Sequence, residues 1–219
     1  MKKYLFKLFI FILLGSTEII FAGSKQSTIT SLPIFTPFEE IEVYSPAVES
    51  RIRLQKLMEM PLNDFVKIIR KRLGKIMSPG SQSISQQQRN TGYKPQIFLS
   101  QWIKNIIFIG DIPREVIICT IIYLERLVSQ NKEMKLTRND AYILFLVATM
   151  LSSKMHEDIT YRNLDWRILG GRAGQFYNIE KLNRIEREIA GLLHYRLHIE
   201  AQEFYDFIIT IDLSQLEKH

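Results

Sequence analysis

Apolar side chains recur at helical spacing along the chain from residue 95 onward. Residues 96–109 carry them three and four positions apart, and Pro113 begins a segment of about 17 residues that is apolar nearly all round. The length of this segment and the lack of neighbouring strand signals favour a buried helix over a strand. Further helices are predicted for residues 140–155, 161–169, 179–194 and 200–211.

Local chemistry predicts where three of these helices begin or end. Residues 137–140 fit a loose capping box, with a carboxylate in the first helical turn. Gly170 and Gly171 can end a helix because glycine adopts the left-handed conformation, and Asn178 can cap the next one. The predicted fold is an all-α bundle of five helices between residues 96 and 194, in which the second and third are the most buried, with one further C-terminal helix.

Residues 1–23 have the order of a secretory signal peptide. Three lysines precede the short apolar run 8–14, and small residues follow at 22–24. The run is shorter than the ~20 residues that a membrane span needs, and an uncleaved anchor over residues 4–21 is the alternative. We therefore expect an exported protein. Removing this leader takes away three lysines and one glutamate, which changes the net charge from +6 to +4 and argues only weakly for nucleic acid or anionic lipid.

Residues 24–94 are predicted to contain a linker and a basic helical region. Residues 24–45 are rich in proline, serine and threonine, which is typical of an extended linker. Residues 51–75 contain eight lysines and arginines, and Pro61 begins a helix that runs through Leu73. Such a charge run is usually a solvated helix face. The alternative is a functional role, in which these residues contact an anionic membrane or an acidic patch on a partner.

The sequence predicts no catalytic, cofactor or metal site. The single cysteine, Cys119, lies in an apolar run, where a buried structural thiol is expected, and it excludes an internal disulfide. The four histidines lack metal-ligand spacing with carboxylates, and no nucleophile stands beside a recognisable base. The glycine-rich residues 170–174 follow no strand, so they predict a turn between helices rather than a phosphate loop. Neither enzymatic activity nor nucleic-acid binding is expected.

Two charged residues lie on otherwise apolar helix faces. Lys154 continues the stripe that contains Met150 and Leu151, and Glu186 borders the apolar face of a later helix. A charge at the edge of a core costs free energy unless it reaches water or finds a partner. Both residues are therefore candidates for receiving a partner protein. The structural alternatives are a snorkelling lysine and a rim ion pair of Glu186 with Lys154 or Arg187.

Four short fragments within residues 116–205 occur in a recognisable order and spacing. They are Tyr123-Leu-Glu-Arg126, Ser153-Lys154 with Glu157-Asp158, Asn163 with Trp166, and Asn183 with Glu186. As a set they resemble a single cyclin box, closest to the PHO-type, U-type and cyclin Y group. The resemblance implies a five-helix cyclin fold over residues 95–212, with additional N- and C-terminal helices.

The resemblance also implies a function. In cyclins, the residues at the positions of Lys154 and Glu186 receive backbone groups of a cyclin-dependent kinase, and Met155, Ala190, Tyr195 and Leu197 would supply neighbouring apolar contacts. We therefore expect a regulatory subunit that binds and activates such a kinase. Together with the leader, this suggests an exported mimic of a host cyclin. The alternative is an exported helical adaptor, or a membrane-associated module, that uses the fold without activating a kinase.

Overall fold

The structure is a computed structural model that describes residues 46–77, 97–134, 136 and 140–214. Every regular element within these residues is a helix, which confirms the predicted all-α class. The predicted leader and linker lie outside the described residues, as does the proposed capping box apart from Asp140. The chain divides into two units, Met1–Glu49 and Ser50–His219.

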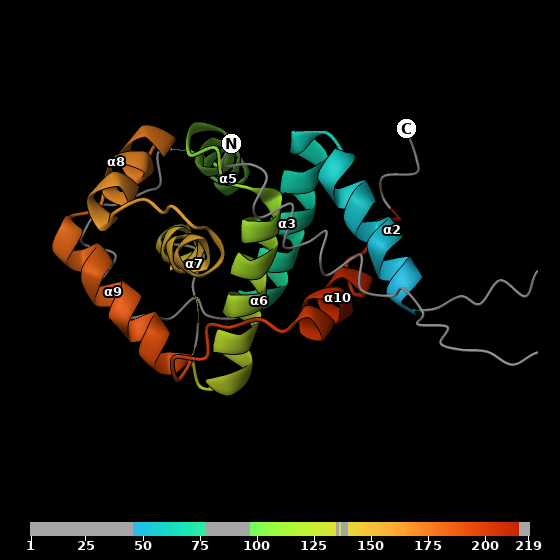
Figure 1. Cartoon of the computed structure of the whole chain (residues 1–219). Helices are drawn as coiled ribbons and strands as arrows, with labels where there is room; N and C mark the ends of the chain where they lie inside the picture. Colours follow the sequence, from blue (N-terminus) through green and yellow to red (C-terminus); the bar gives the residue numbers. More distant parts are fainter. Residues whose placement is uncertain (1–45, 78–96, 135, 137–139, 215–219) are drawn as a thin grey trace, which may run out of the picture. The chain divides into compact units, whose positions relative to one another are not determined.

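Helix α7 (Asp140–His156) lies at the centre of the bundle. All of its residues from 141 to 153 are buried. Because such a helix must be covered on every side, four others surround it, as the view along its axis shows (Figure 1). They are α5 (Leu99–Ile109), α6 (Arg114–Gln130), α8 (Asn163–Ala173) and α9 (Ile179–Leu192). With α7, these are the five helices predicted between residues 96 and 194.

Helix α6 is the second buried helix, as predicted. Residues 116–124 and Leu127 are all buried. Burial raises the pKa of the Cys119 thiol to about 12, so this side chain is a protonated core residue, as expected. The hydroxyls of Thr120 and Ser152 both donate to the carbonyl of Val116, at 2.8 and 2.9 Å, which satisfies the polar groups between α6 and α7.

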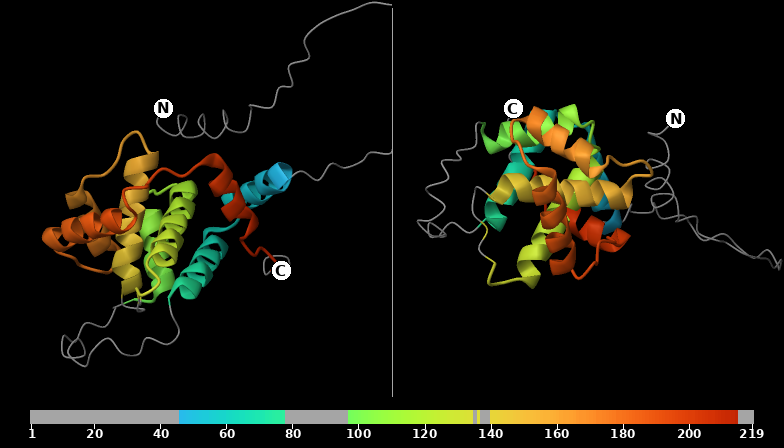
Figure 2. Two further views of the ribbon diagram at one scale, coloured as in Figure 1. Left: turned by 90° about the horizontal axis from the view of Figure 1, so that it is seen from below. Right: turned by 90° about the vertical axis from the view of Figure 1, so that its left-hand side faces the viewer.

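Three further helices pack beside these five. Helix α3 (Leu62–Ile76) contacts α5 and α6 and buries Phe65 and Leu73, and α10 (Ala201–Ile209) contacts α6 (Figures 1 and 2). Helix α2 (Pro46–Glu59) precedes α3 and was not predicted from the sequence, because charged and polar residues are interspersed among its apolar ones. None of the described helices is long and apolar enough to cross a membrane.

The end of α8 differs from the prediction. Gly170 and Gly171 lie inside the helix, which continues to Ala173, and Gly174 adopts the left-handed conformation with a φ of 110°. A Cβ atom on Gly170 would lie 3.1 Å from Leu146 Cδ2 on α7. This glycine therefore permits close packing of α8 on α7, rather than a turn.

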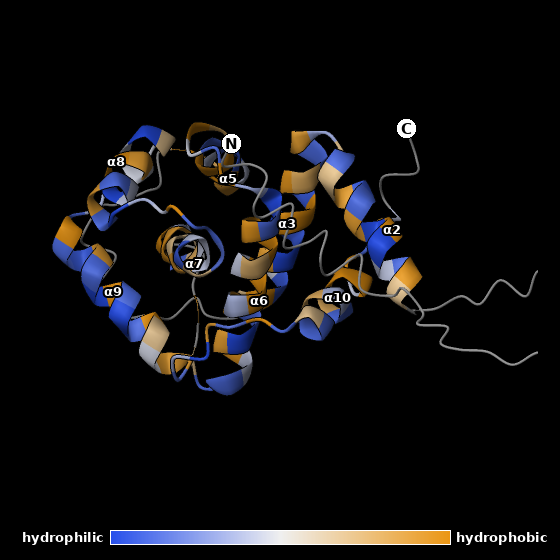
Figure 3. Ribbon diagram, in the orientation of Figure 1, coloured by the Kyte–Doolittle hydropathy of each residue, from blue (hydrophilic) through white to orange (hydrophobic). Residues whose placement is uncertain are grey.

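Helix α9 begins as predicted. Asn178 Oδ1 accepts the backbone N–H of Lys181 at 2.7 Å and caps the helix. The helix ends at Leu192, slightly earlier than expected, and His194 and Tyr195 then have positive φ angles of 51° and 57°. The chain thus turns sharply at these two residues before it continues to α10. Figure 3 shows hydrophilic residues along the outer side of α9.

The substitution Gly174→Ala tests the position of the α8 terminus. We expect it to lower the free energy of unfolding by about 1–3 kcal/mol, because a side chain is strained at this φ and its Cβ would lie 2.8 Å from Ile97 Cδ1. Gly74→Ala is the control, since nothing lies within 4 Å of a Cβ there and α3 should gain about 0.5–1 kcal/mol. Denaturant unfolding measures both, and equal effects would contradict this account.

Candidate functional site

The two charges singled out from the sequence form an ion pair. Lys154 Nζ, in the last turn of α7, lies 2.5 Å from Glu186 Oε1 on α9. The two side chains are 31% and 17% exposed, so the pair is partly desolvated but still reachable from outside. The structure therefore shows the rim ion pair that was one of the alternatives, and neither charge is left without a partner.

Asn163 joins this ion pair to α8. Its Oδ1 accepts a hydrogen bond from Lys154 Nζ at 2.6 Å, while its Nδ2 donates to Glu186 Oε2 at 2.6 Å and to Asn183 Oδ1 at 2.7 Å. A single amide thus uses both its acceptor and its donors to bridge the two charges. We call these four residues from three helices the polar cluster.

The local sequence explains how each helix supplies its part of the polar cluster. Lys154 stands in the last turn of α7, where a cation interacts favourably with the helix dipole. Asn163 is the first residue of α8. Asn183 and Glu186 are three residues apart and therefore share one face of α9. The i, i+3 spacing of the last two was the signal by which Asn183 could have been added to the predicted site.

Exposed apolar side chains lie close in sequence to Lys154 and Asn163 of the polar cluster. Residues 155–164 include four large apolar side chains that are 43–62% exposed, namely Met155, Ile159, Tyr161 and Leu164. Beyond α9, Tyr195 is 74% exposed. Such residues beside a partly exposed polar cluster are typical of a surface that binds another protein.

The four apolar residues predicted to contact a partner lie in different environments. Met155 and Tyr195 are exposed, whereas Ala190 is buried in the core and Leu197 is half-buried against it. The carbonyl of Ala190 accepts the N–H of Tyr195 at 2.8 Å, so these two are joined through the backbone. Met155 and Tyr195 therefore offer the accessible apolar surface, and the roles of all four remain predictions.

A second polar cluster, which the sequence analysis missed, holds the segment that follows α9. Arg126 of α6 donates to the carbonyls of Arg196 and His198, at 2.8 and 3.0 Å. Its Nε also donates to Glu203 Oε1 of α10, at 2.7 Å. A guanidinium group has enough donors to make these contacts together. Arg126 thereby ties α6, the segment after α9 and α10 to one another.

Tyr123, one turn earlier on α6, holds the same segment. Its hydroxyl donates to the carbonyl of Leu197 and lies 3.3 Å from Nε2 of His156. Burial raises the pKa of the phenol well above its usual range. Tyr123 and Arg126, which we call the α6 clamp, are three residues apart, and this spacing was the signal for their shared face. The clamp fixes the backbone that carries Tyr195 and Leu197.

Hydrogen bonds between Ser153 and Glu157 cap the C-terminal end of α7. The hydroxyl of Ser153 donates to the carboxylate of Glu157, and burial raises the pKa of that carboxyl group. The backbone N–H of Glu157 donates in turn to the carbonyl of Ser153, at 2.9 Å. In the part of the chain that the structure describes, no three histidine, cysteine or acidic side chains are grouped to hold a metal ion.

His156 should make the stability of the protein depend on pH. Burial lowers its pKa to about 4, below the ~6.5 expected in the unfolded chain. Between these values the unfolded state binds more protons, so the free energy of unfolding should fall as the pH falls from 6.5 towards 4. The loss of unfolding free energy should be roughly 2 kcal/mol. It is not larger because solvent partly screens the charge of the imidazole.

Denaturant unfolding at several pH values checks this expectation. His156→Gln should remove most of the extra loss of stability between pH 6.5 and 4. His194→Gln is the control, because this side chain is exposed to solvent. Identical pH profiles for the parent protein and His156→Gln would show that His156 does not titrate as described.

Comparison with known proteins gives a family match and three curated relatives. The family model described as "Cyclin, N-terminal domain" matches residues 65–198. All three relatives are from Arabidopsis thaliana. Cyclin-U2-1 is 22% identical, and the match covers 54% of this chain and 51% of the relative. Cyclin-U2-2 is 26% identical over 55% of this chain and 54% of the relative, and Cyclin-U4-2 is 20% identical over 56% of this chain and 54% of the relative. The chain spans about half the length of the curated relatives it matches. No solved structure matches it.

Proposed function

The chain belongs to the cyclin family, and from this premise we propose that it binds a cyclin-dependent protein kinase and shifts it towards its active conformation. The observation that carries the proposal is the polar cluster. It presents Lys154 and Glu186 in one defined geometry at the end of the central helix, with the exposed Met155 beside them. Charges held in this way can hydrogen-bond backbone groups of a partner segment.

The hydrogen bonds within the polar cluster leave capacity for a partner. Lys154 Nζ has three donors and uses two of them, towards Asn163 and Glu186. The Glu186 carboxylate can accept about four hydrogen bonds and accepts two from these same residues. A partner carbonyl and a partner N–H can therefore be added without breaking the ion pair. This lowers the free-energy cost of docking, because the charges need no rearrangement.

The remaining contacts would be apolar and conformational. Met155 and Tyr195 would cover apolar side chains of the kinase, and the α6 clamp would keep the segment of Tyr195 in place. The cyclin then acts by binding the active arrangement of the kinase more tightly than the inactive one. No chemical step is assigned to this chain.

Charge reversal in the polar cluster tests the proposed docking. Full-length protein is mixed with purified cyclin-dependent kinases, and both capture and peptide phosphorylation are measured. We expect Lys154→Glu and Glu186→Lys each to weaken capture by roughly 30-fold or more, because a paired charge loses its partner in a desolvated contact. Lys132→Glu and Glu133→Lys are the controls. These exposed residues lie between α6 and α7, near the end of α7 that is opposite to Lys154. The absence of capture by any kinase, or equal losses in the controls, would refute the proposal.

The double variant that exchanges Lys154 and Glu186 separates docking from folding. It keeps opposite charges on α7 and α9, so the helical content and the unfolding midpoint should stay near those of the parent protein. Kinase capture should not return, because a carboxylate would then meet the partner's carbonyl group. Recovery of capture in the double variant would show that the ion pair has only a structural role.

We further propose that residues 1–23 direct export, so that the protein acts as a cyclin mimic in a host cell. The support is the order of lysines, apolar residues and small residues in the sequence. The mass of the mature chain should show cleavage near residue 23. A full-length chain recovered with membranes would instead establish the anchor.

A further inference from the structure

The net charge of the protein is concentrated in one stretch. Residues 50–77 contain eight lysines and arginines and two acids, a net charge of +6. The whole chain has the same net charge of +6, so all remaining residues sum to zero. Helix α3 and most of α2 therefore form a cationic region in an otherwise balanced protein, and such a region attracts anionic surfaces.

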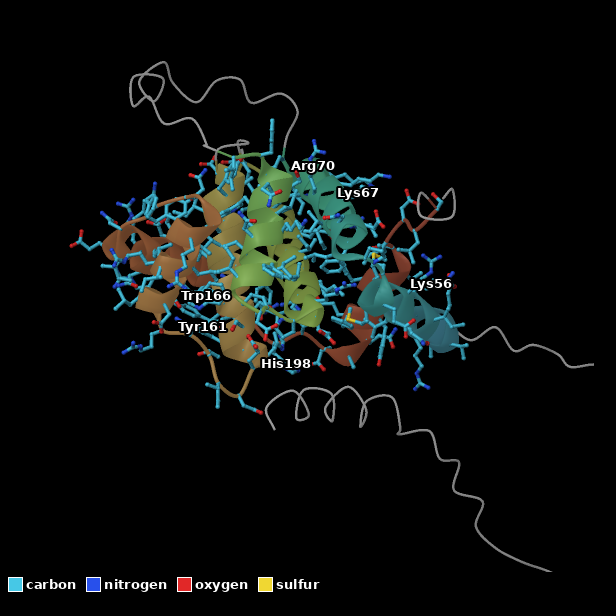
Figure 4. The ribbon with its side chains drawn as sticks, turned by 90° about the horizontal axis from the view of Figure 1, so that it is seen from above. Lys56, Lys67, Arg70, Tyr161, Trp166 and His198 are labelled. Atoms are coloured by element: carbon cyan, nitrogen blue, oxygen red, sulfur yellow. The ribbon has the colours of Figure 1, made fainter. Side chains whose placement is uncertain are left out.

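Helix α3 has one buried face and one cationic face. Its buried residues include Phe65, Ile69 and Leu73, which pack into the core. The exposed basic residues recur three, four and eight positions after the first of them, and we call them the cationic face: Lys67, Arg70, Lys71 and Lys75. Figure 4 shows Lys67 and Arg70 at the outer edge of α3.

Acidic neighbours offset only part of this charge. Lys67 pairs with Asp64 at 2.8 Å, and Lys71 pairs with Asp212 at 2.9 Å. Exposed ion pairs of this kind contribute little stability and stay hydrated. From outside the stretch, Asp212 and Glu125 pair with Lys71 and Arg72, and these two acids offset two of its six net positive charges.

The cationic face and the polar cluster lie on different helices, and Figure 1 shows α3 on the other side of α7 from α8 and α9. In Figure 4, Lys67 and Arg70 are at the opposite edge from Tyr161, which stands between Lys154 and Asn163 in the chain.

We propose that the cationic face binds the headgroups of an anionic lipid bilayer. The four basic residues form an extended row along one helix, which suits a flat surface of repeated negative charges. Within residues 46–77 the exposed large apolar side chains are Val48 and Ile52, and no exposed aromatic residue is available to stack on nucleic-acid bases.

Vesicle sedimentation with the full chain tests this proposal. We expect binding to phosphatidylcholine vesicles that contain phosphatidylserine, and this binding should decline as salt is raised. The triple variant Lys67→Gln, Arg70→Gln, Lys75→Gln should lose affinity by roughly a hundredfold, since each basic residue near the surface contributes about fivefold. Lys71 is kept because its pair with Asp212 connects α3 to the segment after α10, whereas Lys67 pairs with Asp64 inside α3.

A matched variant keeps the total charge equal. Arg167→Gln, Arg172→Gln, Lys181→Gln removes the same charge from exposed positions on α8 and α9 and should bind vesicles like the parent protein. Equal losses in both variants, binding to neutral vesicles that ignores salt, or no loss in the α3 variant would overturn the proposal. So would α3-dependent binding of RNA or polyglutamate without vesicle binding. Circular dichroism confirms that each variant is helical, and the assay needs no kinase, so its outcome is independent of the proposed kinase docking.

Discussion

The burial of α7 is the constraint on which the rest of the structure depends. This helix is buried from residue 141 to residue 153, so α5, α6, α8 and α9 must cover it from all sides. Lys154 is the first side chain at which this cover ends, and its charge must meet polar groups. Asn163 and Glu186 supply them from α8 and α9. The candidate site is therefore the place where the core of the protein ends.

The basic residues of α2 and α3 have two roles, set by the direction in which they point. On the inner side, Arg72 lies 5.0 Å from the ring centre of Phe207 on α10 and pairs with Glu125 of α6. Arg53 donates to the carbonyl of Ile211 at 2.9 Å. On the outer side, Arg70 stays exposed. A single charge run thus attaches the C-terminal segment to the bundle and also creates a cationic surface.

The Tyr-Leu-Glu-Arg fragment of α6 shows how a family motif can be structural. Tyr123 and Arg126 bind backbone carbonyls after α9, and Glu125 pairs with Arg72 of α3. The fragment therefore links the N-terminal helices, the central bundle and the segment that carries Tyr195. Its polar side chains extend in different directions from one helix and bind groups on α3, on α10 and in the segment after α9.

The sequence by itself determined the helical class, the five central helices, the cap at Asn178 and the two charges at the edge of the core, because each depends on spacing or chemistry within a single helix. The tertiary structure alone decided that Asn163 bridges Lys154 and Glu186, since these residues meet only when three helices pack together. It also decided that Gly170 serves close packing rather than a turn, because the required space depends on Leu146 of α7. Local patterns record which face of a helix is buried, and the neighbour that covers this face is set by the packing of the whole chain.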